Sequence, residues 1–416
     1  MSDKIKIFTI SDHPLSPSGV GTQTKYIIEG MLKTGKYQFV SFGGAIKHQN
    51  HDPQKTEEWG ADWIIWPVDG YGNQDQVRAM VRQQKPDILW FMTDPRFYEW
   101  LWLMDNEIRT NVPMVYYHVW DNYPYPNFNR KYYLANDHVA CISKLTHDIV
   151  ETVAPEVDSS YIPHAVHPDI FKPHPVEQIK TWRMSKNLDN KFVCFWNSRN
   201  ARRKQSGTLI WWFKEFLDKV GHDKACLIMH TDVKDQHGQD LEAIINELGL
   251  TNGEVLFSRE KISAVDLAGM YNMADLTICI SDAEGFGLST LESLSSGTPI
   301  LVNMTGGLQD QVTDGEKFFG IGLNPTSKAI IGSQQVPFIY EDRISKEDFI
   351  DALTELYEMT PEARRELGMS GRAWAEDRFG FDKFVQTWDE LFTSIHEEKG
   401  SWEDRKGYLP YETKVF

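Results

Sequence analysis

Two successive series of short apolar runs, each alternating with helical patterns, constrain the fold more than any other feature of this sequence. The first series begins with KIKIFTI at residues 4–10 and ends with HVACIS at 138–143. The second begins with KFVCFWN at 191–197 and ends with FFGIGL at 318–323. Strands that alternate with helices form parallel sheets. The sequence therefore predicts an α/β fold with two doubly wound, Rossmann-like domains that face each other across a cleft.

A proline-dense segment, YIPHAVHPDIFKPHP at residues 161–175, separates the two series and forbids regular structure. We expect an N-terminal domain over residues 1–172 and a C-terminal domain over 173–380. Residues 381–416 should form a C-terminal helix and tail that pack back on the first domain. In sheets of this kind ligands bind at the carboxyl ends of the strands.

Composition narrows the class of protein. The net charge of -17 argues against a large surface for a polyanion, although it leaves room for a small basic pocket. No 18-residue apolar run occurs, and the first residues read as a strand rather than a signal peptide. Each of the four cysteines lies in a short apolar run, which predicts buried thiols in a reducing compartment. We therefore expect a cytoplasmic protein without a transmembrane segment.

The strongest motif is DAEGFGLSTLESLSSGTP at residues 282–299. A predicted strand leads into an acidic loop with two glycines, and a helix starts near Leu288. Gly285 and Gly287 allow close approach of a ligand to the backbone, and the free amides of the first helical turn point at an anion. Glu284 and Glu292 then accept hydrogen bonds from sugar hydroxyls on either side of a phosphate. This division of roles suits a nucleotide sugar.

This segment resembles the Glu-x7-Glu signature of the retaining glycosyltransferases of family 4, which have the GT-B fold. The resemblance implies that Glu284 contacts the donor sugar and that Glu292 holds the ribose. It also implies that the backbone near Gly285, Phe286, Gly287, Leu288 and Ser289 cradles the diphosphate. The resemblance extends from residue 5 to about residue 392 and is sharpest at 274–315.

The segment CFWNSRNARRKQSG at residues 194–207 concentrates cations in an otherwise acidic chain. Fixed cations stabilise the charge that grows on a diphosphate leaving group. The segment is similar to the family's Arg…Lys pair, with Arg199 and Lys204 as the best match and Arg203 as a substitute. The glycines that usually precede the arginine and follow the lysine are replaced by Ser198 and Gln205.

Gly19 and Gly21 lie between the first predicted strand and the first helix. In the family this loop contributes to binding of the donor phosphate or the acceptor. A Gly-x-Gly pair would equally open a dinucleotide site, but Thr24 occupies the place of the third glycine of that fingerprint.

Several further residues are candidates because they follow predicted strands. His118 ends VPMVYYHV and should face the cleft beside the donor sugar, unless it is a packed or capping histidine. Asp94, Asp121 and Tyr123 are weaker candidates for acceptor binding. The stretch VLFSREKIS at 255–263, which contains Lys261, corresponds to the place where the family holds the base. Residues 304–315 resemble the family's Gly-Gly loop, and residues 324–343 read as an extended loop over the cleft.

No Asp-x-Asp and no His-x3-His spacing occurs in the sequence, which predicts chemistry without a metal or cofactor. We expect a hexosyltransferase-like enzyme that moves a sugar, with retention, from a UDP-, GDP- or ADP-sugar to an acceptor hydroxyl. The acceptor stays open among a glycan, a lipid, a protein side chain and a modified nucleic-acid base. The alternatives are an NAD-linked oxidoreductase or epimerase, and a non-catalytic nucleotide-sugar-binding protein of the same fold.

Overall fold

The computed structural model of the chain describes residues 4–122, 125–334 and 336–411. Contacts divide the chain into two compact units. The first unit holds the residues up to Trp120, those of Tyr125–His164 and the C-terminal segment from Asp382. The second unit holds Ala165–Phe381, together with Asp121 and Asn122.

The main boundary follows His164, earlier than the predicted boundary after residue 172. The side chains of the linker explain the difference. Nδ1 of His164 lies 2.9 Å from the hydroxyl of Tyr117 in the first unit. Phe171, further along the linker, packs against Tyr271 of the second unit.

The first unit is built on an eight-stranded sheet in the order β3-β4-β2-β1-β5-β6-β7-β8. Its strand pairs are parallel, except that β3 runs antiparallel to β4. The central strands are apolar and buried along most of their length, as parallel strands covered on both faces must be. The strands are β1 (Ile5–Asp12), β2 (Tyr37–Gly44), β3 (Gln54–Lys55), β4 (Trp63–Pro67), β5 (Ile88–Met92), β6 (Met114–His118), β7 (His138–Cys141) and β8 (Ser159–Tyr161).

Short helices connect these strands, and one long helix returns from the C-terminal end of the chain. The helices of the first unit are α1 (Gly19–Lys33), α2 (Gln74–Gln84), α3 (Glu99–Trp102), α4 (Asp105–Arg109), α5 (Arg130–Leu134), α6 (Lys144–Val153) and α15 (Phe381–Lys399).

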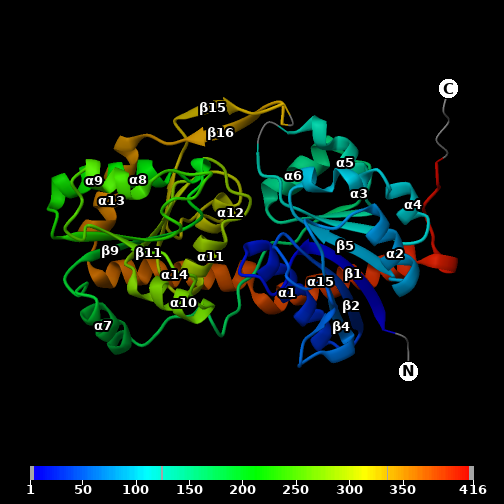
Figure 1. Cartoon of the computed structure of the whole chain (residues 1–416). Coiled ribbons are helices and arrows are strands. Elements are labelled where there is room, and N and C mark those ends of the chain that lie inside the picture. Colours follow the sequence, from blue (N-terminus) through cyan, green and yellow to red (C-terminus); the bar gives the residue numbers. More distant parts are fainter. Residues whose placement is uncertain (1–3, 123–124, 335, 412–416) are drawn as a thin grey trace. The chain divides into compact units, whose positions relative to one another are not determined.

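Helix α15 packs on the sheet of the first unit through an apolar stripe. The Trp388 ring is fully buried and contacts the rings of Trp90 and Tyr117 edge-on. The hydroxyl of Tyr37 on β2 donates a hydrogen bond of 2.6 Å to Oδ1 of Asp389. In Figure 1, α15 accordingly lies beside β1 and β2, so a helix from late in the sequence packs on strands from its beginning.

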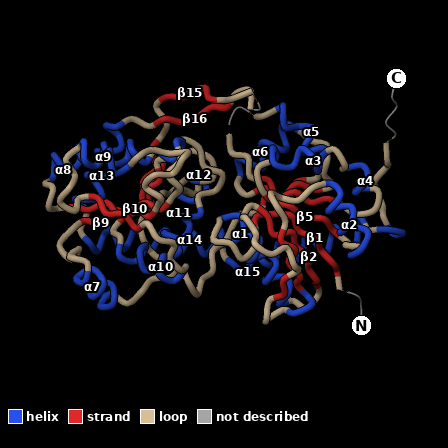
Figure 2. The backbone as a smooth tube through the Cα atoms, viewed as in Figure 1, coloured by secondary structure: helices blue, strands red, loops and turns tan. Residues whose placement is uncertain are grey.

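The second unit contains a six-stranded parallel sheet in the order β11-β10-β9-β12-β13-β14. The helices α8, α9 and α13 lie on one face of this sheet and α10, α11 and α14 on the other (Figures 1 and 2). The strands are β9 (Phe192–Asn197), β10 (Ala225–His230), β11 (Val255–Ser258), β12 (Leu276–Cys279), β13 (Ile300–Asn303) and β14 (Ile321–Leu323). The helices are α7 (Val176–Ser185), α8 (Ser206–Val220), α9 (Leu241–Glu247), α10 (Ala264–Met273), α11 (Leu288–Ser295), α12 (Leu308–Val312), α13 (Lys346–Glu358) and α14 (Pro361–Phe379).

The segment 324–343 is not the extended loop that the sequence predicts. It contains two antiparallel strands, β15 (Ser327–Ile331) and β16 (Ile339–Arg343). Polar contacts anchor β16 to the second unit, because the buried Glu341 carboxylate binds Arg202, and Oγ1 of Thr305 donates 2.7 Å to Asp342. The two strands were not predicted because the few β-branched residues of this segment alternate with Gly, Pro and charged residues.

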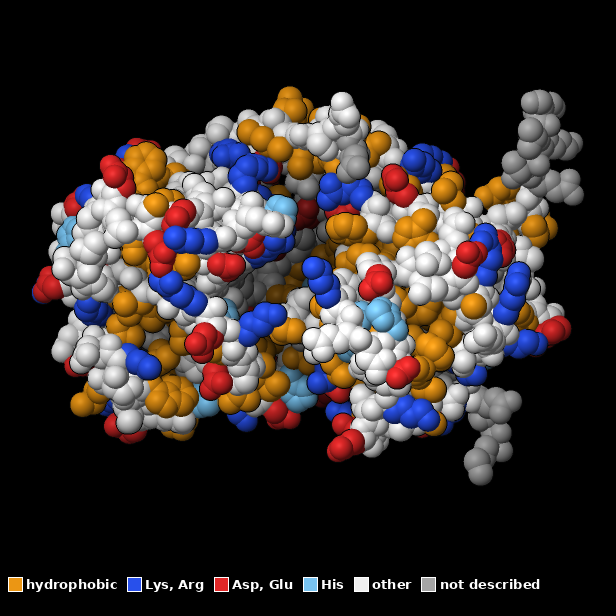
Figure 3. Space-filling view, viewed as in Figure 1, with side chains coloured by type: hydrophobic (Ala, Val, Ile, Leu, Met, Phe, Trp, Pro, Cys, Tyr) orange, Lys and Arg blue, Asp and Glu red, His pale blue; other side chains and the backbone are white. Residues whose placement is uncertain are grey.

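The four cysteines are free and buried, as predicted. Basic and acidic side chains are intermixed on the face of the molecule that Figure 3 displays. Within the described residues, no helix combines the length and the apolar character that a membrane crossing requires.

Candidate functional site

The candidate site is built around the start of α11, in the loop that follows β12. Gly287 adopts a left-handed conformation, with φ of 91°, and precedes the first helical residue. A Cβ atom there would lie 2.5 Å from Cδ2 of Leu308, so only glycine fits. No side chain of the described residues caps this helix. The amides of its first turn are therefore available to an anion.

A second glycine pair supports this loop from behind. The amide of Gly307 donates a hydrogen bond of 3.0 Å to the carbonyl of Glu284. Gly306 has a φ of 51°, and a Cβ atom at this position would lie only 1.8 Å from the same carbonyl oxygen. The Gly-Gly segment at 306–307 thus fixes the backbone of Glu284 by close approach.

Gln311 is a site residue that the sequence analysis missed. Its side chain is fully buried, and Nε2 donates to the carbonyls of Phe286 at 2.7 Å and Gly287 at 3.0 Å. Oε1 accepts a hydrogen bond of 2.7 Å from Thr290 in the first turn of α11. Gln311 therefore orients the loop and the helix together.

The side chains of Arg203, Lys204 and Glu284 form one cluster beside this loop. Lys204 pairs directly with Glu284, and these side chains are 12% and 13% exposed. Arg203 places Nη1 3.8 Å from Glu284 and also donates to the carbonyl of Ala283. Burial by itself raises the pKa of the Glu284 carboxyl, but the two cations outweigh it and hold that pKa below its usual value. Glu284 is therefore ionised, with two cations around it.

Arg199, predicted as the arginine of the diphosphate grip, lies outside this cluster. Its guanidinium is 60% exposed and forms a two-pronged pair with Asp235, at 2.6 and 3.1 Å. The 3-10 turn Arg202–Lys204 is the reason, because it directs Arg203 and Lys204 toward Glu284 instead. The structure thus brings Arg203 and Lys204, and not Arg199, beside Glu284.

A hydrogen bond between Gln205 and Asp282 joins the segment that follows β9 to the loop that follows β12. Gln205 is left-handed, with φ of 57° and ψ of 33°, where the resembling family usually has glycine. Its Nε2 donates 2.6 Å to Asp282, and its Oε1 accepts 2.7 Å from Thr208. Burial raises the pKa of Asp282 to about 6. Asp282 also accepts, through its carbonyl, a hydrogen bond of 2.8 Å from the amide of Asp342.

Glu292 lies on α11, about one turn beyond the helix start, and binds a buried tyrosine. The hydroxyl of Tyr271 donates 2.7 Å to Oε2 of Glu292 and accepts 2.9 Å from Nδ2 of Asn197. Desolvation raises the pKa of Glu292 to about 7, against the opposing effect of the Tyr271 hydrogen bond. Tyr271 and Asn197 were not foreseen from the sequence, since neither belongs to the motif.

The predicted glycines of the first unit open α1. Gly19 is exposed, whereas the Gly21 amide donates 2.9 Å to Oγ of Ser18, the N-cap residue. A Cβ atom on Gly21 would lie 2.7 Å from the His13 carbonyl oxygen, so tight packing explains that glycine. Ser18 in turn donates 2.7 Å to Asp12. Part of this helix terminus is therefore capped by the chain itself.

His118 is enclosed by neighbouring side chains. Its side chain is fully buried in the first unit, with Nε2 2.9 Å from the Tyr133 hydroxyl and Nδ1 4.0 Å from Sγ of Cys141. Burial lowers the pKa of this imidazole to about 3, which keeps it neutral. The strand end was placed correctly, but Tyr133 of α5 covers it. The packed histidine is thus the arrangement that the structure shows.

The remaining candidates do not share one location. Asp94 caps the 3-10 helix Pro95–Tyr98, accepting 2.9 Å from the Arg96 amide, and pairs with the Arg96 side chain. Asp121 is partly buried, groups with the second unit and lies within electrostatic range of Arg203, Lys204 and Glu284. Lys261 is exposed in the loop between β11 and α10. Tyr123 lies outside the described residues.

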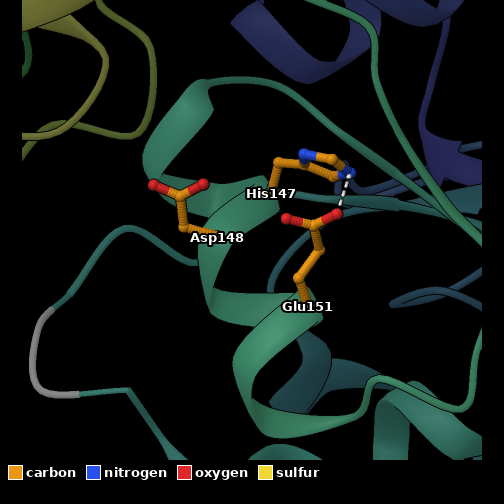
Figure 4. Close-up of side chains that lie close together, drawn as sticks. All are labelled: His147, Asp148 and Glu151. Carbon is orange, nitrogen blue, oxygen red and sulfur yellow. Dashed lines mark ion pairs between the residues drawn. The ribbon is translucent and has the colours of Figure 1, made fainter.

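One group of side chains has the spacing of a metal site. His147, Asp148 and Glu151 lie on one turn of α6, with ligand atoms within 4.8 Å of one another (Figure 4). Nε2 of His147 is 3.8 Å from Glu151 and 3.2 Å from Oγ of Ser159. The two carboxylates are exposed, and such surface groups are common without an ion. We assign no metal site to them.

A search of protein families matches residues 178–374 to the family described as "Glycosyl transferases group 1". Two curated relatives are both called D-inositol 3-phosphate glycosyltransferase. The protein from Arthrobacter sp. (strain FB24) is 34% identical over 76 residues, 18% of this chain and 18% of its own. The protein from Streptomyces scabiei (strain 87.22) is 27% identical over 164 residues, 39% of this chain and 31% of its own. The matches thus span less than a third of these relatives.

Solved structures resemble the chain over nearly its whole length. Sucrose-phosphate synthase from Thermosynechococcus elongatus has a TM-score of 0.73 at 16% identity, covering 95% of this chain and 100% of its own. HepE from Anabaena, solved in complex with UDP and glucose, has a TM-score of 0.69 at 17% identity, covering 94% and 100%. At these identities the likeness shows the fold, which is GT-B, as predicted.

Proposed function

We propose that the protein transfers a sugar from a nucleoside diphosphate to an acceptor hydroxyl, because residues 178–374 match the family described as "Glycosyl transferases group 1". One observation carries the proposal: the cations Arg203 and Lys204 converge with Glu284 beside the uncapped start of α11. The two cations lie where the helix amides also point, with Glu284 and Asp121 as acidic groups within electrostatic range. Such a combination binds a pyrophosphate.

The donor is held by four kinds of contact in this proposal. The amides from Phe286 to Ser289 and the cations bind the diphosphate. Glu284, ionised by its neighbours, accepts hydrogen bonds from the hydroxyls of the transferred sugar. Glu292 accepts hydrogen bonds from the ribose. Its pKa of about 7 lets the carboxyl lose its proton near neutral pH, so that both of its oxygens can accept.

The reaction breaks the bond between the anomeric carbon and the phosphate oxygen, whose electron pair leaves with the diphosphate. The acceptor oxygen forms the new bond on the face that the leaving group vacates, and its proton passes to the departing phosphate. The configuration of the sugar is thereby retained. Arg203 and Lys204 stabilise the leaving charge as the group departs, so we propose that no metal is required.

The donor to test first is UDP-glucose, because HepE, whose fold is similar, was solved with UDP and glucose. GDP- and ADP-glucose are the competing donors. The acceptor stays open among a glycan, a lipid, a protein side chain and a modified base. Hydrolysis of the donor therefore serves as the assay, since water replaces the acceptor.

The test is the rate of UDP release from UDP-glucose by the full chain and its variants. Glu284→Gln and Lys204→Ala should each lower the rate of UDP release about 10²–10³-fold, the usual loss for one preorganised electrostatic group. Lys204→Ala keeps Arg203 near Glu284, so the carboxylate is not left without a cation. EDTA should leave the wild-type rate unchanged.

Two matched controls sharpen the assignment. Arg199→Ala removes an arginine from the same motif. Because this arginine pairs with Asp235, its removal should lower the rate of UDP release less than threefold. Lys214→Ala removes an exposed lysine of α8. Undiminished release in both Glu284→Gln and Lys204→Ala would refute the proposal. Nucleotide binding without any release would identify a binding protein instead of an enzyme.

A further inference from the structure

A cavity of about 970 Å³ lies in the second unit, away from the start of α11. Its walls include residues that directly precede strands: Lys224 before β10, Asp275 before β12 and Pro299 before β13. The candidate site lies instead in loops that follow β9 and β12. In a parallel sheet, residues that precede the strands and loops that follow them lie at opposite ends of the strands. The cavity is therefore separate from the proposed donor site.

Basic side chains dominate this cavity although the chain as a whole is strongly acidic. Its acidic lining residues are Asp189, Asp275 and Glu362. The apolar part of the wall includes Ile179, Met184 and Met369. The basic lining residues are Lys180, Arg183, Lys191, Lys224, Arg364 and Arg365. A ligand that fits both features is an anion with an organic body.

Part of this positive charge is rigidly held. Arg183 and Arg364 share the carboxylate of Asp275, at 3.0 and 3.7 Å, and all three side chains are at most 16% exposed. Arg364 also donates to the last carbonyls of α13 and lies over the Phe192 ring. Two guanidinium groups against one carboxylate leave one positive charge uncompensated in the wall. Such a charge favours an anionic ligand.

Two polar atoms in the same wall are left without partners by the described residues. Oγ of Ser296 and Nε of Arg364 are buried and form no hydrogen bond. Ser296 is only 3% exposed. Both atoms lie behind the cavity surface, so the basic side chains and the apolar wall are the groups that can contact a ligand.

We propose that this cavity binds a small organic phosphate, a phosphomonoester free in solution. The dianionic phosphate supplies acceptors for the Lys191 ammonium and the Arg365 guanidinium, and the organic body contacts the apolar wall. A macromolecular polyanion is disfavoured by the charge of the chain.

The cavity is connected to the candidate site through α10 and α11. Ser296 ends α11, its amide donating 3.0 Å to the carbonyl of Glu292. Thr298, in the wall, donates 2.8 Å from Oγ1 to the carbonyl of Tyr271, whose hydroxyl binds Glu292. A ligand that orders this wall therefore orders Tyr271 and α11. It should tighten donor binding, a consequence that rests on the proposed function.

The test is calorimetric titration of the full chain, in phosphate-free buffer without nucleotide. The probes are glucose 6-phosphate, glycerol 3-phosphate and 3-phosphoglycerate, with glucose and glycerol as uncharged controls. At least one phosphomonoester should bind, and Lys191→Glu with Arg365→Glu should weaken it about tenfold or more. Lys214→Glu, in the same unit but outside the cavity, and Lys204→Ala should leave that binding unchanged.

Two outcomes would overturn the proposal. One is that none of the three phosphomonoesters binds. The other is that binding is lost in Lys204→Ala but kept in the double variant, which would place the phosphate at the donor site. The titration contains no nucleotide, so a failure of the proposed transferase function leaves this result readable. UDP affinity that does not respond to the bound phosphomonoester would refute the coupling alone.

Discussion

The left-handed Gln205 offers the sharpest test of how the basic loop is held in place. Replacing it with glycine removes both the backbone strain and the side chain, whereas replacing it with alanine removes the side chain alone. The native side chain bridges Asp282 at 2.6 Å and Thr208 at 2.7 Å. The two variants therefore separate the strain from the hydrogen bonds.

The magnitudes follow from the structure. A non-glycine residue in the left-handed region costs about 1 kcal/mol or slightly more. Loss of the bond to Asp282, which is 3% exposed and keeps Arg343 at 3.3 Å, costs about 0.5–1.5 kcal/mol, the usual net value of one hydrogen bond. We expect Gln205→Ala to destabilise the second unit by about 1–2 kcal/mol. Gln205→Gly should destabilise it by about 1 kcal/mol less.

Amide hydrogen exchange in α8 is the suitable assay, because the two units can unfold separately and α8 reports on the second unit. Gln178, exposed on α7, provides the matched control. At position 178 the glycine variant should be less stable than the alanine variant by about 1 kcal/mol, the reverse of the order expected at position 205. If Gln205→Gly proves less stable than Gln205→Ala, the strain argument is wrong.

Three other predictions follow from the same site. Gly306→Ala should reduce donor hydrolysis at least tenfold, because its Cβ would overlap the Glu284 carbonyl, whereas Gly253→Ala, left-handed but in open space, should leave hydrolysis unchanged. Gln311→Ala should weaken UDP binding about tenfold by freeing the carbonyls of Phe286 and Gly287; unchanged affinity in calorimetry would contradict this. The raised pKa of Glu292 means that the folded state retains a proton that the unfolded state has released, so stability falls as pH rises from about 4.5 through 7. Urea titrations at pH 5 and 8 should therefore show that the stability of Glu292→Gln relative to wild type increases with pH, and a constant difference would refute the assignment.

The sequence predicted the parts of the site that depend on local chain geometry. Gly287 and α11 follow from the strand-loop-helix pattern, because a glycine before a helix after a buried strand has a direct conformational meaning. Glu284 and Glu292 were found for the same reason, as positions counted from that helix. The two doubly wound, Rossmann-like domains followed from two series of strands and helices.

Residues whose role depends on a distant neighbour could not be predicted. The choice between Arg199 and Arg203 depends on the direction of one 3-10 turn and on Asp235, which competes for Arg199. The burial of His118 depends on Tyr133, which the strand pattern does not bring to it. Gln311 belongs to the site because α12 packs behind the loop that precedes α11, and the sequence pattern does not show this contact.

The central claim is that the start of α11, together with Arg203 and Lys204, grips a pyrophosphate. A crystal structure of the full chain with UDP tests it most directly. The account predicts the β-phosphate within hydrogen-bonding distance of the Leu288 and Ser289 amides and of the two cations, with the ribose on Glu292. A diphosphate bound at another place, with these groups still paired as they are now, would contradict it.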